Sequence, residues 1–501
     1  MKTPRVFLMM IVGAGLLCAC AKEEPAYVDI FYTADAEGFY NSRPEPRFEN
    51  AWAGGYAILK SFFDRQDPDS LFFDGGNWFG SSPEATLTQG GYMTGFLRAL
   101  PYSAMSVSGP DFAFGWPALR NIVKELTYPV LVSNLKLENQ RPWPLHSYHI
   151  FTRKGMKVGV FGLVGAEVVQ NNKTRLAGFS VQDPTATAAE MVTLLQGKGV
   201  DLIVLLSSLG ESANTDTAPA EVSLLEEVSG IHLVLSANKG REEAETDRMN
   251  QTYIVYPGAK LDSVAHVRVW FDKNKQVKEI TFEDVPLLQQ TWGEDQELAD
   301  QSARLQQETQ RKLNARISQT EEKISTSLVR ESALGDLLTD CLSKWSRLDG
   351  AILNSDSIRS SLAQGVITEY DLYKMYPYGD NITFLTLKGA ALLKALEASL
   401  SAKDNFPQIA GFRVLYNPLA SAGSRIKQVT LNNGRIIRPY ETYRFAVTDH
   451  ILAGGFGHDY FIDSLEFKNT FVDVRQIIRS CLIRQKKITP PAQNRWQIFS
   501  P

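Results

Sequence analysis

The sequence predicts an α/β protein made of two globular parts joined by a charged helix. Between residues 27 and 285, short apolar runs such as 202–206 alternate with helical patterns, which is typical of buried sheets covered on both faces. Residues 293–316 carry many charges and few large apolar residues, which indicates a solvated interdomain helix. A second mixture of helices and strands follows, from about residue 327 to residue 485.

The composition is that of an ordinary globular protein. The chain has 501 residues, 22% of them charged, and a net charge of −4. This balance offers no excess of cations for a phosphate backbone, so we expect no nucleic-acid partner. After the first 20 residues, no stretch is long and apolar enough to predict a transmembrane helix.

Residues 1–20 have the features of a lipoprotein signal peptide. A charged start precedes an apolar core too short to span a bilayer stably, and two cysteines follow. Lipidation needs a small residue before the cysteine, and Ala19 precedes Cys20 whereas bulky Leu17 precedes Cys18. We therefore expect a lipid on Cys20 that anchors the protein to a membrane of the bacterial cell envelope, periplasmic or surface-facing. An ordinary secretory signal is the alternative.

The remaining chain divides where its composition changes. We predict a first domain over residues 21–290, a helical linker over 291–326, a second domain over 327–485 and a tail over 486–501. The tail contains two consecutive prolines, and we expect it to be poorly ordered.

Two cysteines lie beyond the signal peptide, Cys341 and Cys481, each among apolar residues. We interpret both as small core residues. An oxidising compartment would permit a disulfide between them without requiring one.

The first domain contains five short motifs in a fixed order. They occupy residues 33–38, 74–80, 108–115, 206–210 and 235–239. Their order and spacing resemble those of the 5′-nucleotidase family of calcineurin-like metallophosphoesterases. The resemblance implies a four-layer metallophosphoesterase-like β-sandwich flanked by helices. It also implies a pair of divalent metal ions that generates a hydroxide and binds the phosphoryl oxygens.

Most metal-binding positions of the family carry other residues in this chain. In the first motif Asp35 is unchanged, but Glu37 stands where the family has a histidine. In the second motif Asn77 replaces the aspartate that bridges both ions. In the fourth and fifth motifs Ser208 and Ala237 replace ligand histidines, and Lys239 replaces the last one.

The third motif has lost the catalytic pair of the family. When Asp111 is aligned with the glutamate of the family motif, Gly109 falls on the ligand asparagine. Pro110 then falls on the transition-state histidine and Ala113 on the aspartate that orients it. We therefore assign no catalytic residue.

Four oxygen-bearing residues remain near these loops: Asp35, Glu37, Asn77 and Asp111. We expect no tight cofactor, because every imidazole ligand is missing. A weakly bound divalent metal of the Mg, Ca or Mn type is the alternative, since such ions prefer oxygen ligands. We also hypothesise that Lys239 replaces the missing positive charge between Asp35 and Glu37. The alternative is that it points to solvent.

The second domain resembles the nucleotide-binding C-terminal domain of the same family. Residues 354–359 fit the pattern N-G-G-x-I-R, which implies that Asn354 and Arg359 contact the nucleotide. Tyr378 and His450 fall where the family stacks the base between two rings. Phe456 replaces the ribose-binding aspartate.

Arg359 also has a structural interpretation. Asp356 and Asp371 are the carboxylates with which it could form an ion pair instead of binding a phosphate.

The sequence therefore predicts a lipid-anchored protein that lacks metal-dependent phosphoesterase activity and binds a nucleotide or phosphoester, or acts in surface interaction. An active 5′-nucleotidase-like hydrolase with a remodelled divalent-metal site is the alternative. A purely structural envelope protein is a third hypothesis. The sequence indicates no protein partner.

Overall fold

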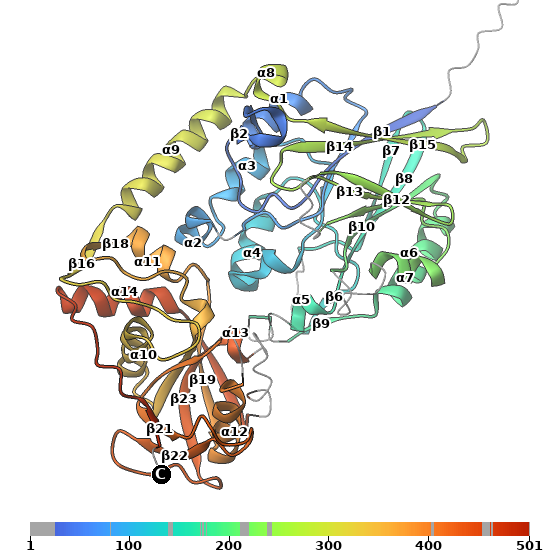
Figure 1. Ribbon diagram of the computed structural model, residues 1–501. Helices are drawn as coiled ribbons and strands as arrows, with labels where there is room; N and C mark the ends of the chain where they lie inside the picture. The colour runs from blue at the N-terminus through green and yellow to red at the C-terminus, as the bar shows by residue number, and fades with distance from the viewer. Residues whose placement is uncertain are drawn as a thin grey trace, which may run out of the picture.

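The computed structural model describes residues 26–80, 82–138, 144–170, 172, 175, 176, 178–210, 220–237, 243–401, 405–452, 461 and 464–499. The predictions for Cys20, Lys239 and Phe456 concern residues outside this set. The elements form an N-terminal half, residues 26–286, and a C-terminal half, residues 316–499. Helix α9 (Gln296–Leu313) lies between the halves in the chain (Figure 1).

Two β-sheets pack face to face in the N-terminal half. The first has the order β15-β14-β1-β4-β5 and the second has the order β12-β13-β11-β10-β8-β7. The first contains β1 (Tyr27–Thr33), β4 (Leu71–Asp74), β5 (Ala104–Met105), β14 (Ser263–Phe271) and β15 (Val277–Pro286). The second contains β7 (Tyr148–Arg153), β8 (Met156–Val164), β10 (Leu202–Ser208), β11 (Leu233–Ser236), β12 (Glu245–Met249) and β13 (Thr252–Tyr256). Buried side chains of both sheets, among them Phe73 and Val204, form one core between them.

Helices cover the outer faces of both sheets (Figure 1). The first sheet packs against α1 (Tyr56–Phe63), α3 (Met93–Ala99) and α4 (Gly115–Glu125). The second packs against α6 (Pro184–Gly197) and α7 (Ala220–Glu227). The N-terminal half therefore has four layers, which confirms the predicted α/β sandwich.

Parallel pairing gathers the five motifs at one region of the sandwich. β4 pairs in parallel with β1 and β5, and β10 pairs in parallel with β8 and β11. The carboxyl ends of parallel strands lie at the same edge of a sheet. Each motif follows the end of β1, β4, β5, β10 or β11, so the motifs meet there although they are distant in sequence.

The predicted charged helix corresponds to α9. The carboxylate of Asp295 accepts a hydrogen bond from the Leu298 backbone N–H at 2.9 Å and caps the helix. Only a few of its side chains are buried, Leu298 and Leu313 among them. The linker expected over 291–326 ends in a strand rather than a helix, because β16 (Arg316–Thr320) pairs with β18 (Gly365–Thr368) of the C-terminal half.

The C-terminal half is built on a five-stranded sheet of order β20-β17-β23-β19-β24. Its strands are β17 (Gly350–Asn354), β19 (Asn381–Lys388), β20 (Pro407–Ala410), β23 (Thr442–Thr448) and β24 (Glu466–Asp473). Helices α10 (Ala333–Ser346) and α14 (Val474–Gln485) pack in one core, and α12 (Gly389–Ser399) packs in a second. A three-stranded sheet of β22 (Ile426–Leu431), β21 (Phe412–Tyr416) and β25 (Trp496–Ile498) lies beside them.

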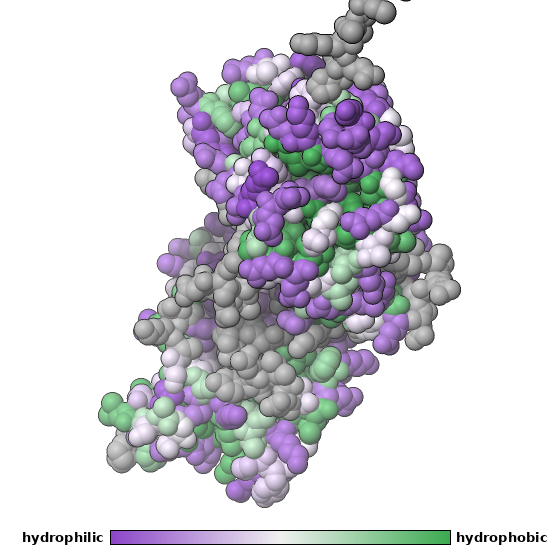
Figure 2. All heavy atoms as spheres, turned by 90° about the vertical axis from the view of Figure 1, so that its right-hand side faces the viewer, coloured by the Kyte–Doolittle hydropathy of each residue, from purple (hydrophilic) through white to green (hydrophobic). Residues whose placement is uncertain are grey.

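The outer surface is mixed in character. On the face in Figure 2, hydrophilic residues predominate and apolar ones lie among them, as on most globular proteins. Within the part of the chain that the structure describes, every helix is too short or too polar to cross a membrane.

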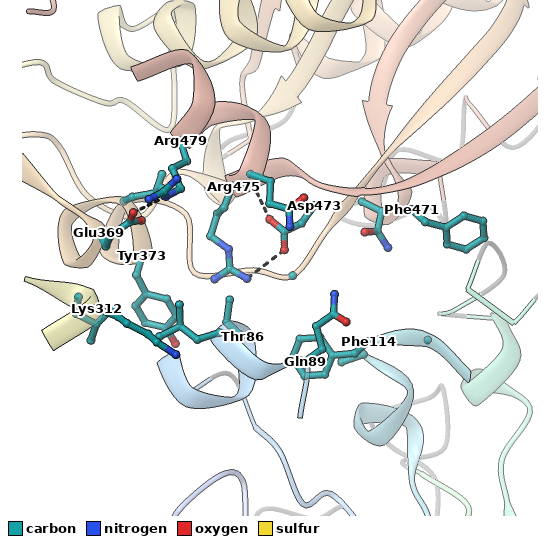
Figure 3. Close-up of a pocket in the computed structure, with 18 of the residues that line it drawn as sticks. Thr86, Gln89, Phe114, Lys312, Glu369, Tyr373, Phe471, Asp473, Arg475 and Arg479 are labelled. Atoms are coloured by element: carbon teal, nitrogen blue, oxygen red, sulfur yellow. Dashed lines mark hydrogen bonds and ion pairs between the residues drawn. The ribbon is translucent and has the colours of Figure 1, made fainter. Parts of the chain in front are cut away.

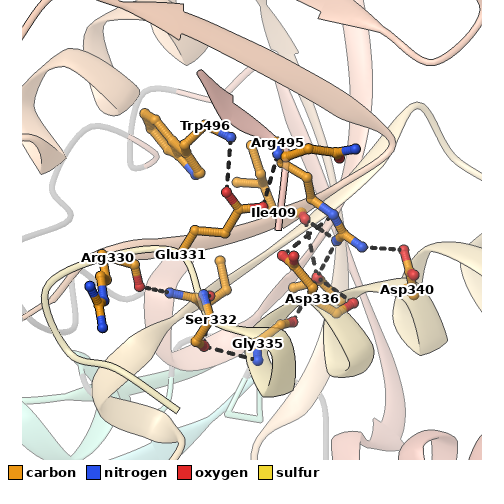
Figure 4. Close-up of polar contacts among 12 residues, drawn as sticks. Arg330, Glu331, Ser332, Gly335, Asp336, Asp340, Ile409, Arg495 and Trp496 are labelled. Atoms are coloured by element: carbon orange, nitrogen blue, oxygen red, sulfur yellow. Dashed lines mark hydrogen bonds and ion pairs between the residues drawn. The ribbon is translucent and has the colours of Figure 1, made fainter. Parts of the chain in front are cut away.

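The prediction of a poorly ordered tail over 486–501 is wrong for the described residues up to 499. β25 pairs in parallel with β21, and Ile488 and Trp496 are buried. Both Glu331 oxygens accept backbone hydrogen bonds from the tail, from Arg495 at 2.9 Å and from Trp496 at 3.2 Å (Figure 4). The two consecutive prolines led to the prediction of disorder, although the buried Ile488 and Trp496 lie on either side of them.

Arg495 also fixes the tail to helix α10. Its guanidinium lies 3.0 Å from the Asp340 carboxylate and 3.4 Å from that of Asp336 (Figure 4). Asp336 is fully buried. Burial raises the pKa of Asp336 to about 8; Arg495 opposes this increase, and the neighbouring Glu331 carboxylate adds to it.

The prediction that Cys341 and Cys481 are core residues is confirmed, and the disulfide that the sequence left open is present. Both are buried, and they form a disulfide with an S–S distance of 2.01 Å. The bond joins α10 to α14 across 140 residues of sequence. The chain-entropy account assigns about 5 kcal/mol to closing a loop of this length, whereas disulfides typically contribute about 2–4 kcal/mol.

We predict that Asp336→Asn makes the protein less sensitive to pH. The native state binds the Asp336 proton more tightly than the unfolded chain, so the parent loses stability as pH rises from about 4 to about 8. The neutral amide removes this loss. Urea unfolding at pH 5 and pH 8 should show the variant gaining on the order of 2–4 kcal/mol relative to the parent between the two values.

The matched control is Asp340→Asn, which removes a partly exposed partner of the same arginine. It should not reproduce the pH-dependent gain. Parallel stability profiles for the parent and Asp336→Asn would contradict the argument.

Candidate functional site

Backbone hydrogen bonds connect the loops that follow β1 and β4. The N–H groups of Asp35, Glu37 and Gly38 donate to the carbonyls of residues 76, 77 and 78 at 2.9–3.0 Å. The Asn77 amide also donates to Asp35 Oδ1 at 2.9 Å. These hydrogen bonds therefore hold the first two sequence motifs together. They also bring Asn77 and Asp35, two of the predicted metal ligands, into direct contact.

These loops retain an unusual backbone conformation. Asp35, Glu37 and Asn77 have φ values of 52°, 50° and 62°, in the left-handed region that side-chain-bearing residues adopt rarely. Such conformations cost free energy and concentrate at binding and catalytic sites. The backbone of a ligand-binding loop is thus present, although most of its ligand side chains are not.

Asp111 is a structural residue that fastens these loops. Its Oδ2 accepts hydrogen bonds from the backbone N–H groups of Asn77 at 2.7 Å and Ser108 at 2.9 Å, and from the Ser108 hydroxyl at 3.1 Å. Its Oδ1 accepts from the Trp78 N–H at 2.8 Å. Burial raises the pKa of Asp111 to about 6, and these donors oppose the increase. Both oxygens are occupied by the protein, which leaves Asp111 no clear position for a metal ion.

Asp74 is a second buried carboxylate, and the sequence analysis did not single it out. It lies at the end of β4 and accepts hydrogen bonds from the Thr33 hydroxyl at 2.7 Å, the Gly76 N–H at 2.9 Å and the Trp78 indole at 2.7 Å. Burial raises the pKa of Asp74 to about 7. Its hydrogen bonds join the end of β1 to the loop that follows β4, which is a structural function.

The corner where histidine ligands would meet is closely packed. A Cβ atom added to Gly75 would lie 2.2 Å from the Tyr32 hydroxyl oxygen and 2.9 Å from the Ala237 methyl carbon. The space between these three residues is therefore too small for even one more methyl group. Tyr32 is fully buried, and burial raises its pKa well above the usual value. A phenol and a methyl group thus occupy space next to the loop that carries Asp35.

The last two motifs bind a carboxylate of the chain itself. Ser207 and Ser236, at the ends of neighbouring parallel strands, donate their hydroxyls to Glu221 Oε1 at 2.9 and 2.5 Å. Glu221 is buried at the start of α7. This carboxylate was not predicted, because nothing in the sequence places Glu221 beside the two serines.

Cations surround the exposed side of this region. Burial and repulsion from Asp35 raise the pKa of Glu37, while Lys260 and Arg43 lower it. Lys260 also donates its backbone N–H to the Asp35 carbonyl at 2.7 Å. The Lys239 hypothesis lies outside the described residues, but the structure already supplies two basic residues near Glu37.

The residues present do not fit the metal pair that the family implies. Of the four predicted oxygen ligands, Asp111 already accepts four hydrogen bonds from the protein, and Asn77 is a neutral amide whose Nδ2 donates to Asp35. Asp35 and Glu37 are the two carboxylates left for an ion, too few for a metal pair. Among the described residues, no group of three or more His, Cys, Asp or Glu side chains could hold an ion. Pro110 lies in a short 3₁₀ helix and has no acid or base function.

Arg175 connects this region to the C-terminal half. Its guanidinium donates to the carbonyls of Ala113 and Gly379 at 2.5 and 2.6 Å and to the Asp449 carboxylate at 2.9 Å. Burial raises the pKa of Asp449 to about 6, and Arg175 opposes the increase. Ala113 was aligned above with the aspartate that orients the family's histidine. Here it contributes a backbone carbonyl to the contact between the two halves.

The predicted nucleotide-binding residues of the C-terminal half lie close together, around a residue that was not predicted. Asn354 is buried at the end of β17. Its amide donates to the Asp356 carboxylate, and its carbonyl accepts from the Ser357 hydroxyl at 2.9 Å. Asp356 stands where the family pattern has a glycine. Its carboxylate therefore takes up the amide hydrogen bond that Asn354 could otherwise offer to a ligand.

Arg359 forms no ion pair with Asp356 or Asp371, which contradicts the alternative interpretation. Its Nε donates to the Tyr378 hydroxyl at 2.6 Å, and its guanidinium lies 5.5 Å from the Tyr378 ring centroid. Asp371 instead caps α11 (Glu369–Met375). The Arg359 side chain is exposed and remains available to an anion.

Electrostatics place His450 near the same carboxylate. Burial raises the pKa of Asp356, whereas the Asn354 hydrogen bond and the nearby His450 and Arg359 lower it. The four predicted residues Asn354, Arg359, Tyr378 and His450 therefore surround Asp356 or contact one another. Its negative charge opposes the binding of a phosphate at Arg359.

The two halves together define a four-layer α/β sandwich joined to a second α/β domain. Residues 311–463 match the family described as 5′-nucleotidase, C-terminal domain. A 5′-nucleotidase of Vibrio cholerae is 24% identical over 463 residues, which cover 83% of this chain and 82% of that protein. The C-terminal half thus carries the match to the 5′-nucleotidase C-terminal domain family, and the chain is similar to a 5′-nucleotidase over most of its length.

Solved structures share the fold. The structure of a 5′-nucleotidase precursor from Thermus thermophilus has a TM-score of 0.63 and 20% identity, covering 95% of this chain and 100% of that one. The NAD nucleotidase of Haemophilus influenzae has a TM-score of 0.60 and 14% identity, with coverage of 95% and 100%. The two-part architecture thus extends over nearly the whole chain.

We predict that Asp356→Gly strengthens nucleotide binding. The substitution restores the residue of the family pattern, releases the Asn354 amide and removes a negative charge near Arg359. Calorimetric titration with AMP should show affinity about tenfold higher than that of the parent, which corresponds to about 1.4 kcal/mol.

Asp356→Asn is the matched control, because it removes the charge and keeps the size of the side chain. It should give part of the gain. Equal or weaker AMP binding by Asp356→Gly would show that the carboxylate does not oppose the ligand.

Proposed function

We propose that this protein is a lipid-anchored member of the 5′-nucleotidase family that lacks metal-dependent phosphoesterase activity and binds a nucleotide or phosphoester at the cell envelope. The observation that carries the proposal is the saturation of the metal-binding region by the chain itself. Asp111 accepts two hydrogen bonds from the loop after β4 and two from Ser108 of its own loop, and the Asn77 amide donates to Asp35. Among the described residues, no group of three or more His, Cys, Asp or Glu side chains could hold the metal ions that generate a hydroxide in a two-metal site.

The C-terminal half supports a binding role. Arg359 is exposed and, within the described part of the chain, free of carboxylate partners, and a guanidinium is suited to a phosphate. Tyr378 offers an aromatic face beside it. Asp356 limits the affinity, so we infer weak binding with a preference for ligands that tolerate a nearby negative charge.

The disulfide supports a location outside the cytoplasm, where conditions are oxidising. The disulfide between Cys341 and Cys481 is of the kind that persists in such compartments. We infer that a lipid on Cys20 holds the protein at the membrane, with both halves in the periplasm or at the cell surface.

We predict no phosphoesterase activity. Purified protein supplied with Mn²⁺, Zn²⁺, Mg²⁺ or Ca²⁺ should not release phosphate or nitrophenol from AMP, UDP-glucose or bis-p-nitrophenyl phosphate above the rate of its Asp35→Ala variant. Asp35→Ala is the control because Asp35 is the one unchanged metal-binding residue. Turnover that disappears in this variant would overturn the proposal in favour of an active hydrolase.

We predict that the anchor depends on Cys20. The Cys20→Ser variant should leave the membrane fraction or accumulate as an unprocessed precursor, which fractionation and mass spectrometry can detect. Cys18→Ser is the matched control and should remain anchored. The reverse pattern would place the lipid on Cys18.

A further inference from the structure

A cavity of about 610 Å³ lies between the two halves, beside α9 and α14 (Figure 3). The N-terminal half contributes Thr86 and Gln89 next to α2 (Pro83–Thr88) and Phe114 next to α4. The C-terminal half contributes Tyr373 of α11 and Arg475 of α14. We call this cavity the interdomain pocket. Its volume falls within the range of small-molecule binding sites.

The interdomain pocket is separate from the predicted nucleotide site. None of Asn354, Arg359, Tyr378 and His450 lines it. The two sites are nevertheless neighbours, because Gly379 borders the pocket and follows Tyr378 directly. A ligand in the pocket would therefore contact different side chains from a ligand at Arg359.

A buried arginine points into this pocket. The side chain of Arg475 is only 7% exposed, and its Nε has no hydrogen-bond partner. Its other nitrogens make long contacts, 3.3 Å to the Pro377 carbonyl and 3.4 Å to the Asp473 carboxylate. Figure 3 shows its guanidinium in the space between α14 and the N-terminal half. An incompletely paired buried cation is costly unless an anion joins it.

Positive charge exceeds negative charge around the pocket. Its basic lining residues are Arg175, Lys312, Arg475 and Arg479, and its acidic ones are Glu369 and Asp473. Arg479 is paired with Glu369. Lys312, at the end of α9, has no carboxylate within ion-pair distance in the described part of the chain. Arg175 is paired with Asp449, so Arg475 and Lys312 are the cations that favour an anionic ligand.

Aromatic and apolar side chains line the pocket beside these cations. Phe114 and Tyr373 lie on different halves of the protein, and Leu313 lies at the end of α9. The Arg475 guanidinium is 5.7 Å from the Tyr373 ring centroid, within cation–π range. A Cβ atom at Gly379 would lie 3.8 Å from the Phe114 ring and 4.0 Å from Arg475 Nη2, so ring and cation are neighbours.

We propose that the interdomain pocket binds a small organic anion in which a phosphate or carboxylate group is attached to a flat aromatic body. The anionic group pairs with Arg475 and Lys312, and the body lies against Phe114 and Tyr373. Because both halves supply contacts, the ligand stabilises their present arrangement. This second site does not depend on the proposed nucleotide-binding function.

Calorimetry on the purified protein can test the proposal with two anionic probes, phenyl phosphate and benzoate, which distinguish the phosphate from the carboxylate form. At least one should bind more than tenfold more tightly than inorganic phosphate or phenol, which carry only the charge or only the ring. Arg475→Gln should weaken this binding about tenfold or more, as expected for a lost charge-assisted contact. Phe114→Ala should weaken it severalfold, because the N-terminal half then contributes no ring.

Two matched controls separate the sites. Arg484→Gln removes an exposed arginine of the same helix outside the pocket and should leave binding unchanged. Arg359→Gln should also leave it unchanged while weakening AMP binding. If Arg475→Gln does not fold, the exposed Lys312→Met variant and Phe114→Ala still test the pocket. The proposal is overturned if neither probe outperforms inorganic phosphate and phenol, or if Arg359→Gln abolishes binding that Phe114→Ala and Lys312→Met leave intact.

Discussion

The parallel pairing of β1 with β4 is the constraint on which the N-terminal site depends. It places the ends of both strands side by side, so that the following loops can bind each other through backbone hydrogen bonds. Asp74 and Asp111 then fasten these loops from two sides. Backbone contacts need no particular side chain, so this loop geometry does not depend on which ligand side chains the loops carry.

The sequence predicted the layers because buried parallel strands have a local signature, a short apolar run before a turn. It predicted the loops of the site by their spacing. It could not distinguish a ligand from a structural carboxylate, since Asp111 became a loop fastener only through donors from residues 77, 78 and 108. The sequence left the disulfide open and missed the ordered tail for a related reason: both depend on partners far away in the chain.

The two halves have diverged from the family pattern in a similar way. In the N-terminal half, Asn77 binds the retained Asp35. In the C-terminal half, Asp356 binds the retained Asn354. In each half, a predicted ligand-binding side chain forms a hydrogen bond with another side chain of the protein. Arg359 is the exception, because in the described structure its side chain donates to a neighbouring tyrosine hydroxyl rather than to a carboxylate.

The hydrogen bond between Glu331 and the Trp496 N–H spans 165 residues of sequence. Closing so long a segment costs chain entropy before the contact can contribute, and folding slows as contacts become less local. β25 pairs with β21 in the three-stranded sheet, and the disulfide joins α10 to α14 within the same half. A fragment of the C-terminal half that stops short of β25 would therefore lack the strand that covers β21 and the backbone donors that satisfy Glu331.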